Sequence, residues 1–400
     1  MKKIIGAALL LAGTCIGAGM LALPVSTAPL GLLGASVILI LASLFMAYTG
    51  YLVVEVSQWF RQETSYISMA RAVLGKPGQY LAWVSFLLLL YALMVAYMTG
   101  GGALVAALAH SYHVPMLPWQ SYLPWLLVFA IIVYRGAKSS DWVNRILMLG
   151  LVISYLVLAA AIVPHLHEPE LTAPIKWHYI IAALPVIIAS FGYHIVLPSM
   201  CQYLKHDKRS IVLMVAIGSI LPLVVYLLWV ILIFASVPLQ GSSGLMALLD
   251  SGQPVHLLTH VLAQITQNNW VVYAAKCFAF FAIASSFIGV SLGLFDLLAD
   301  GFKSRSIASH RLGVAFLTFV PPFLFACVYP QGFLYALGYA GVFVAVLHGI
   351  LPALMVWRGR YHQYQKGDYR APGKRGTLIL VFVVSIIIIL AQLIVNLGWV

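Results

Sequence analysis

The sequence predicts an all-α integral membrane protein, and its composition is the first observation that predicts it. Hydrophobic residues make up 63% of the 400 positions, whereas charged residues make up only 8%. A soluble domain has roughly a quarter of its residues charged, because its surface must face water. This chain has too few charged residues for such a surface, so the composition indicates that a lipid bilayer surrounds it.

The second observation is a series of long apolar stretches along the whole chain. A helix that crosses a bilayer needs about 20 mostly apolar residues. Eleven stretches meet or approach this length, and the fourth is the shortest. They cover residues 4–26, 32–58, 80–109, 121–135, 142–164, 178–200, 210–235, 270–299, 310–329, 331–356 and 377–399. The sequence therefore predicts eleven transmembrane helices.

The third observation is the position of the positive charges, which fixes the orientation. With a cytoplasmic N-terminus, all but two of the 22 Lys and Arg residues lie on the cytoplasmic side, the exceptions being Lys176 and Lys276. The long loop 236–269 contains neither residue type, as expected of an exported loop. We therefore predict a multi-pass membrane protein with its N-terminus in the cytoplasm and its C-terminus on the opposite side of the membrane. Because the charges are spread over short loops, the net charge of +12 does not indicate a nucleic-acid partner.

The first stretch contains the sequence GTCIGAGMLALP (13–24), in which three glycines precede a proline. The sixth stretch contains SFGYHIVLPS (190–199), with a glycine and a proline at comparable places. Five spans lie in each of two units, 1–165 and 176–357, and an extra helix follows at 377–400. Because five is odd, the second unit enters the membrane in the opposite direction, which is typical of secondary transporters with inverted repeats.

Glycines in a membrane helix have two interpretations here. Gly13 and Gly17 have the small-xxx-small spacing of a helix-packing face. Alternatively, the helix is interrupted, and its freed backbone groups face a cavity, because they cannot face lipid. The second half-helix would then direct its N–H groups at a carboxylate. Since the interruption occurs at matching places in both units, we expect a transporter for a solute that carries a carboxylate.

Four stretches resemble the hydroxy/aromatic amino acid permease family of the amino acid–polyamine–organocation superfamily. They are GTCIGAGMLALP, LPVIIASFGYHIVLPSMCQY (184–203), SSFIGVSLGLFDLLAD (285–300) and YPQGFLYALGYAGV (329–342). The resemblance implies a leucine-transporter-type fold of two inverted five-helix repeats. It also implies proton-coupled uptake of an aromatic amino acid across the bacterial inner membrane by alternating access, with tyrosine as the expected substrate. The C-terminus would then lie in the periplasm. Tryptophan, phenylalanine, serine and threonine are the alternative substrates within the family.

The resemblance places the substrate at the two interruptions, where backbone N–H groups would bind its carboxylate and freed carbonyls its ammonium. The residues expected there are Thr14, Ala18, Gly19, Tyr97, Ser190, Phe191, Gly192 and Tyr193. For Thr14, a hydrogen bond to its own helix is the alternative.

Coupling to an ion has two sets of candidate residues. For a proton, the candidates are His194, because the reference pKa of histidine is near neutral, and Lys276, for which snorkelling to the membrane surface is the alternative. For sodium, the candidates are Gly13, Ile16, Ser285 and Ser286. The serine pair has interhelical packing as its alternative. No cofactor or metal is expected apart from the coupling ion, and the sequence sets no oligomeric state.

Two other classes of membrane protein are disfavoured. An enzyme would need acidic or nucleophilic residues grouped within the membrane, yet all ten acidic residues lie in loops or near span ends. A channel would need a charged ring or a repeated filter motif, and the sequence contains neither.

Overall fold

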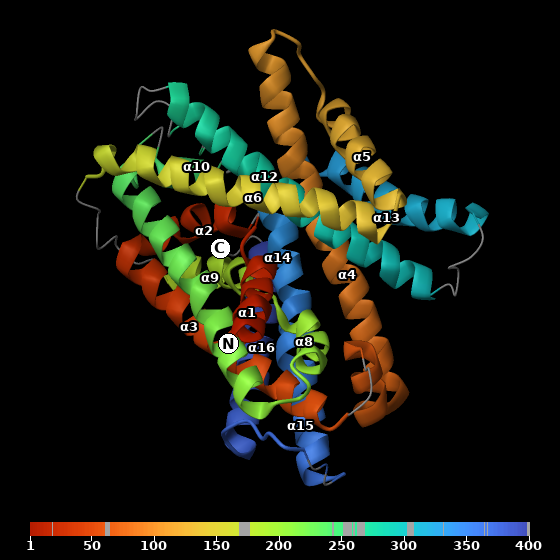
Figure 1. Cartoon of the computed structure of the whole chain (residues 1–400). Coiled ribbons are helices and arrows are strands. Elements are labelled where there is room, and N and C mark those ends of the chain that lie inside the picture. The colour runs from red at the N-terminus through yellow and green to blue at the C-terminus, as the bar shows by residue number, and fades with distance from the viewer. Residues whose placement is uncertain are drawn as a thin grey trace.

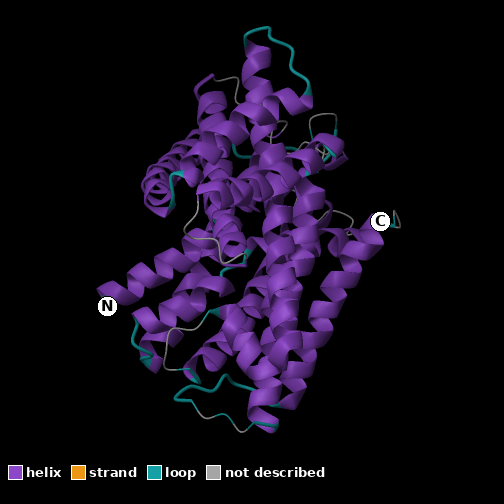
Figure 2. Ribbon diagram, turned by 90° about the vertical axis from the view of Figure 1, so that its right-hand side faces the viewer, coloured by secondary structure: helices purple, strands orange, loops and turns teal. Residues whose placement is uncertain are grey.

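The protein is helical in all of its described elements, as the computed structural model shows (Figure 1). The structure describes residues 1–17, 19–60, 65–167, 177–241, 244–250, 258, 261, 269–301, 308–330, 332–363, 365 and 367–397. Within these ranges Figure 2 contains helices and loops and no strand. The predicted all-α class is therefore confirmed for the part of the chain that the structure describes.

The helices follow the predicted spans. The first unit contains α1 (Lys2–Cys15), α2 (Gly19–Thr27), η1 (Ala28–Leu30), α3 (Gly31–Gln58), α4 (Tyr66–Ser111), α5 (Pro118–Tyr134), α6 (Ala137–Ile162) and η2 (Val163–His165). The second contains α7 (Trp177–Ser190), η3 (His194–Val196), α8 (Leu197–Tyr203), α9 (Lys208–Ser236), α10 (Leu245–Asp250), α12 (Asn269–Gly301), α13 (Ala308–Val328), α14 (Phe333–Val344), the π-helix η4 (Ala345–Ile350) and α15 (Leu351–Tyr361). The final helix is α16 (Arg375–Asn396).

Nine segments of the described chain are helical, long and apolar enough to cross a membrane. The fifth helix, α5, is apolar but has only 17 residues, and α1 has 14. The protein is thus a multi-pass membrane protein. The count of eleven spans remains a prediction.

Local sequence explains where the long helices bend and begin. Gly75 has a φ of 78°, a conformation that only glycine adopts without strain, and α4 bends there. Pro77 then stands near the start of the straight part of α4, where its missing N–H is harmless. The side chain of Asp207 accepts a hydrogen bond from the Ser210 N–H at 2.9 Å and caps the first turn of α9.

The packing of helices follows a regular pattern between the two units. Helix α3 packs against α9, and α4 packs against α12. In addition, α4 packs against α14, and α12 packs against α6, which crosses in front of it in Figure 1. Helices α3, α4 and α6 of the first unit therefore all pack against helices of the second unit.

One buried ion pair joins three parts of the chain. Arg360 of α15 binds Glu55 of α3, and the two side chains are only 3% and 2% exposed. The Glu55 carboxylate also accepts the Ala371 N–H at 2.7 Å, while Arg360 donates to the Ala371 carbonyl at 2.8 Å. Because removing one partner of a buried pair costs about 3–5 kcal/mol, this contact fixes α3, α15 and the segment before α16 together.

Candidate substrate and coupling site

The helix is interrupted in both places that the sequence predicts. Helix α1 ends at Cys15, Ile16 is extended with φ −73° and ψ 107°, and α2 begins at Gly19. Helix α7 ends at Ser190, and the 3-10 turn η3 begins at His194. Both interruptions are therefore confirmed, although Ala18 itself lies outside the described residues.

The two interruptions lie against each other. A Cβ atom built on Gly19 would lie 2.7 Å from the Ser190 hydroxyl oxygen and 3.5 Å from the Ser190 Cα. Any side chain at Gly19 would therefore collide with the end of α7. Glycine at this position is what allows the start of α2 to approach the second interruption so closely.

Tyr226 of α9 connects the ends of the two interrupted helices, and it was not among the predicted site residues. Its hydroxyl oxygen lies 2.6 Å from the Cys15 carbonyl oxygen and 2.8 Å from that of Ser190. These are the last residues of α1 and α7, whose carbonyls have no partner within their own helices. Since a phenol has a single hydrogen, it donates fully to one carbonyl at a time. Tyr226 is fully buried, so its hydrogen bonds lie inside the protein.

Helix α9 also contacts α2, the helix that follows the first interruption. The indole N–H of Trp229 donates to the Met20 carbonyl at 2.9 Å, one residue into α2. Trp229 is fully buried. One helix turn of α9 therefore carries both aromatic residues that position the interruptions.

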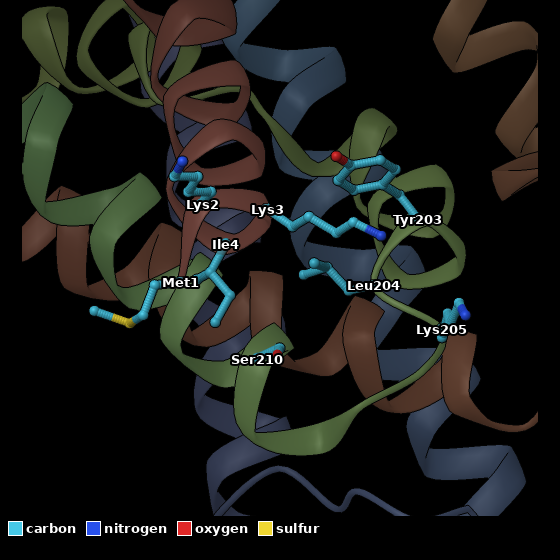
Figure 3. Close-up of a pocket in the computed structure, with 8 residues that line it drawn as sticks. All are labelled: Met1, Lys2, Lys3, Ile4, Tyr203, Leu204, Lys205 and Ser210. Carbon is cyan, nitrogen blue, oxygen red and sulfur yellow. The ribbon is translucent and has the colours of Figure 1, made fainter.

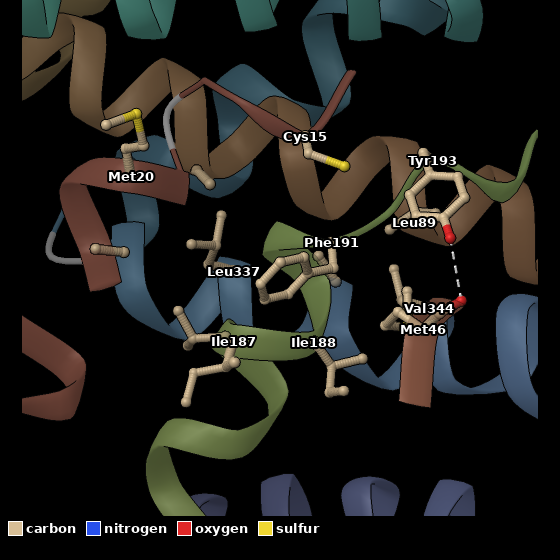
Figure 4. Packing of buried hydrophobic residues seen from close by; sticks show 14 of the residues in the cluster. Cys15, Met20, Met46, Leu89, Ile187, Ile188, Phe191, Tyr193, Leu337 and Val344 are labelled. Atoms are coloured by element: carbon tan, nitrogen blue, oxygen red, sulfur yellow. Dashed lines mark hydrogen bonds between the residues drawn. The ribbon is translucent and has the colours of Figure 1, made fainter. Parts of the chain in front are cut away.

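Ser190 and Phe191 are occupied by contacts within the protein. The Ser190 hydroxyl donates to the Val186 carbonyl of its own helix at 2.9 Å. The Phe191 ring meets the Tyr226 ring edge to face, with centroids 5.1 Å apart. Phe191 is 1% exposed and lies among the apolar side chains of Figure 4. A substrate ring reaches Phe191 only if this packing changes.

Tyr193 and His194 both contact α3, and Tyr193 also contacts α9. The Tyr193 hydroxyl lies 2.7 Å from the Ser219 hydroxyl and 3.3 Å from the Met46 carbonyl, the contact drawn in Figure 4. His194 Nε2 lies 2.8 Å from the Thr49 hydroxyl oxygen. The second interruption therefore presents a titratable ring to the interior.

Helix α12 lies against the first interruption through the predicted serines. A Cβ on Gly17 would collide with the Ser286 hydroxyl, and the Tyr97 phenol hydrogen-bonds to the same serine. Tyr97 is 8% exposed, so this contact is buried on the tyrosine side. The structure thus brings together Gly17, Tyr97 and Ser286.

The other residues predicted for the ion site and the first interruption make different contacts from this group. The Ser285 hydroxyl donates to the Ala282 carbonyl of its own helix at 3.3 Å. Gly13 faces α6, where its nearest neighbour is the Met148 methyl group, and Ile16 is half-buried. Thr14 is exposed, and its hydroxyl donates to the Leu11 carbonyl at 2.7 Å, which is the alternative stated above.

Lys276 is half-buried on α12, about two turns from the first residue of that helix. A lysine stem spans such a distance toward the membrane surface. Its role as a coupling residue remains a prediction.

A separate cavity lies where the N-terminus of α1 meets the end of α8, and Figure 3 shows it. Its volume is about 320 Å³, and it is lined by Met1, Lys2, Lys3, Ile4, Tyr203, Leu204, Lys205 and Ser210. The Lys3 ammonium lies 5.9 Å from the centre of the Tyr203 ring. None of its lining residues belongs to either interruption. Its three lysines match the positive charge expected at a cytoplasmic surface.

Comparison with known proteins gives a consistent result. The model of the tryptophan/tyrosine permease family matches residues 1–392. The chain is 31% identical to "Tyrosine-specific transport system 2" of Haemophilus influenzae over 100% of this chain and 98% of that protein. It is 30% identical to "Tryptophan-specific transport protein" of the same organism, over 99% and 97% of the two chains. It is also 30% identical to "Low affinity tryptophan permease" of Escherichia coli, over 88% and 86%. The chain belongs to the tryptophan/tyrosine permease family and is therefore a membrane transporter rather than an enzyme.

Proposed function

We propose that this protein is a proton-coupled symporter that imports aromatic amino acids, with tyrosine preferred, by alternating access. The observation that supports this proposal best is the close approach of Gly19 to Ser190, which places two interrupted membrane helices side by side. Freed N–H groups at the start of α2 suit a carboxylate, and carbonyls at the end of α7 suit an ammonium. An amino acid carries both groups next to each other.

The eleven-span architecture with an inverted repeat is part of this proposal. Its support is the symmetry of the packing: the third and tenth spans pair through α4 and α14, and the eighth and fifth pair through α12 and α6. Shifting each span number by five converts one pair into the other, as two inverted five-helix repeats require. The cytoplasmic N-terminus and periplasmic C-terminus rest on the charge distribution.

The aromatic substrate class is supported by the names of the relatives, which specify either tyrosine or tryptophan. Tyrosine is our first choice because of the resemblance noted in the sequence, and tryptophan is the second candidate because relatives named for both are about equally similar. In the leucine-transporter arrangement, Thr14, Ala18, Gly19, Tyr97, Ser190, Phe191, Gly192 and Tyr193 would line the substrate. Since Phe191 now packs on Tyr226, we expect the substrate ring to displace this contact.

Sodium coupling is the second candidate mechanism, and one specific contact favours it. Ser286 lies directly against Gly17 at the first interruption, where a serine hydroxyl and freed carbonyls would together surround a cation. Gly13, Ile16 and Ser285 complete the set that the fold implies. Against it, the nearest neighbour of a Cβ at Gly13 is Met148 of α6 and not either serine.

Uptake by purified protein in liposomes tests the proposal. Labelled tyrosine is offered under an inward proton gradient and, separately, an inward sodium gradient, with unlabelled tryptophan, phenylalanine and serine as competitors. We expect accumulation with the proton gradient alone and competition by aromatic amino acids. Accumulation that requires sodium would overturn proton coupling, and uptake of serine without tyrosine would overturn the substrate class.

A further inference from the structure

Two buried histidine rings stack on each other beside the second interruption. The rings of His194 and His348 have centroids 4.2 Å apart and planes inclined by only 11°. His194 is 0% and His348 1% exposed. His194 begins η3, directly after the interruption, and His348 lies in the π-helix η4 between α14 and α15. A Cβ on Gly192 would lie 3.5 Å from the His348 ring, so the interruption itself touches the pair.

The position of the pair along the chain places it deep in the membrane. His194 lies near the middle of the apolar segment Tyr179–Tyr203, and His348 near the middle of Phe333–Tyr361. Ionisable residues at such depth are costly, and they occur where ions or protons move. The π-helical segment around His348 also indicates a functional role, because π-helical turns occur frequently at functional sites.

The hydrogen bonds around His194 define which of its nitrogens accepts a proton. The Thr49 hydroxyl donates its single hydrogen to the Met46 carbonyl at 3.1 Å. In the Nε2–H tautomer of His194 the Thr49 oxygen, 2.8 Å from Nε2, is then the acceptor, and the lone pair of the ring lies on Nδ1. Among the described residues, His194 Nδ1 and both ring nitrogens of His348 are buried without a hydrogen-bond partner. Each neutral ring thus holds one lone pair ready to bind a proton.

The stacked geometry limits how many protons the pair holds. Hydrogen bonds lie in the plane of an imidazole ring, so parallel rings in face contact do not hydrogen-bond to each other. Two imidazolium charges about 4 Å apart would repel each other strongly, and a like charge disfavours the second protonation. The pair therefore accommodates one proton.

Among the described residues, no ion pair or charged hydrogen-bond partner gives the histidine pair a counter-charge from the surrounding elements. On α3 and α15, Glu55 and Arg360 bind each other. On α4, Tyr66 donates its hydroxyl hydrogen to the Leu347 carbonyl. The remaining described groups on elements that contact the pair are listed here: Tyr48 and Tyr51 of α3, Arg71, Lys76, Tyr80, Tyr91, Tyr97 and His110 of α4, Cys201 and Tyr203 of α8, Tyr335 and Tyr339 of α14, Arg358 and Tyr361 of α15, and Arg375 of α16. Tyr193 stacks on His194 at 4.8 Å and is bound to Ser219.

We propose that His194 and His348 form one proton-binding site, which takes up a single proton in each transport cycle together with the amino acid. The proton comes from the periplasmic side and forms one N–H bond at a free lone pair of the pair. It leaves from the same nitrogen to the cytoplasm, so atoms and charge balance over the cycle. A positive charge here stabilises the substrate carboxylate at the neighbouring interruption, which links proton binding to substrate binding. This inference rests on the proposed function and adds His348 to it.

The test compares His348→Gln with wild type and with His110→Gln, a matched control at the exposed end of α4. Each protein is reconstituted as the full chain, and labelled tyrosine uptake is measured in two modes. Counterflow at equal pH needs substrate binding and alternating access only, whereas accumulation under an inward proton gradient also needs coupling. We expect His348→Gln to retain counterflow but to lose at least nine-tenths of accumulation, and His110→Gln to retain both.

Accumulation by His348→Gln at the wild-type level would overturn the histidine site and leave the proposed function intact. Failure of wild type to accumulate tyrosine with protons would instead overturn the proposed function. If His348→Gln does not fold, the wild-type protein still provides a test through its proton-to-tyrosine ratio. A ratio of one supports the single-proton site, and a ratio of two contradicts it.

Discussion

The two interruptions occupy equivalent places in their units but differ in chemistry. The first, between α1 and α2, is rich in glycine and has no titratable side chain between Ile16 and Gly19. The second, between α7 and η3, carries Tyr193 and ends at His194. The first is therefore suited to close backbone contact with a charged ligand group, and the second to a proton. Under the proposed function, helix packing places the two breaks together, while local sequence divides substrate binding and proton coupling between them.

The largest effect is expected from adding a side chain at Gly19, where the first interruption meets the second. Gly19→Leu should abolish tyrosine binding, because even its Cβ would lie 2.7 Å from the Ser190 hydroxyl. Equilibrium binding of labelled tyrosine measures this. Gly6→Leu is the control, because nothing lies within 4 Å of a Cβ there. Normal affinity in Gly19→Leu would contradict the assignment of this interruption.

Removing the group shared by both interruptions should have the next largest effect. Tyr226→Phe leaves the buried carbonyls of Cys15 and Ser190 without their donor, at a cost of about 1–3 kcal/mol. We expect tyrosine affinity to fall by roughly tenfold if this cost falls on the binding-competent state. Tyr273→Phe, a change at an exposed residue of α12, should have no effect. Equal affinities for Tyr226→Phe and wild type would show that the shared hydroxyl does not position the breaks.

Substitution of the serine at the first interruption distinguishes the two coupling ions. Ser286→Ala should change proton-driven uptake by no more than about fivefold, the effect of one ordinary hydrogen bond of about 1 kcal/mol. If sodium drives transport, the same variant should lose sodium-driven uptake. Parallel uptake assays under each gradient measure both. Loss of proton-driven uptake in this variant would place proton coupling at the first interruption. It would thus contradict the assignment of coupling to the second interruption.

The smallest expected effect lies outside the membrane, at the cap of α9, the helix that holds both interruptions. Hydrogen bonds from the Ser210 side chain and N–H lower the pKa of the Asp207 carboxyl. A lowered folded-state pKa contributes stability above the unfolded pKa, and this contribution disappears as the pH falls through the folded value. Asp207→Ala should therefore melt slightly earlier than wild type at pH 7, with the difference shrinking in acid. A difference that is constant with pH would exclude the charged cap as its cause.

Sequence alone predicted the elements of this arrangement better than their contacts. Glycine and proline in apolar stretches predict interruptions because their backbone preferences act locally, and both interruptions were found. Tyr226 was missed because its partner Cys15 lies 211 positions away, and a sequence does not give the rotation of one helix against another. His348 carried a usable signal, as a histidine in the middle of the predicted span 331–356. Its stacking on His194 depends on tertiary packing.

The central claim, that protons and tyrosine enter together, is tested most directly by measuring proton movement after tyrosine is added. Liposomes containing the protein, without any imposed gradient, are placed in weakly buffered, sodium-free medium, and the external pH is recorded after tyrosine is added. Symport predicts alkalinisation of the medium, with one proton entering for each tyrosine. Tyrosine entry without any pH change would contradict the account.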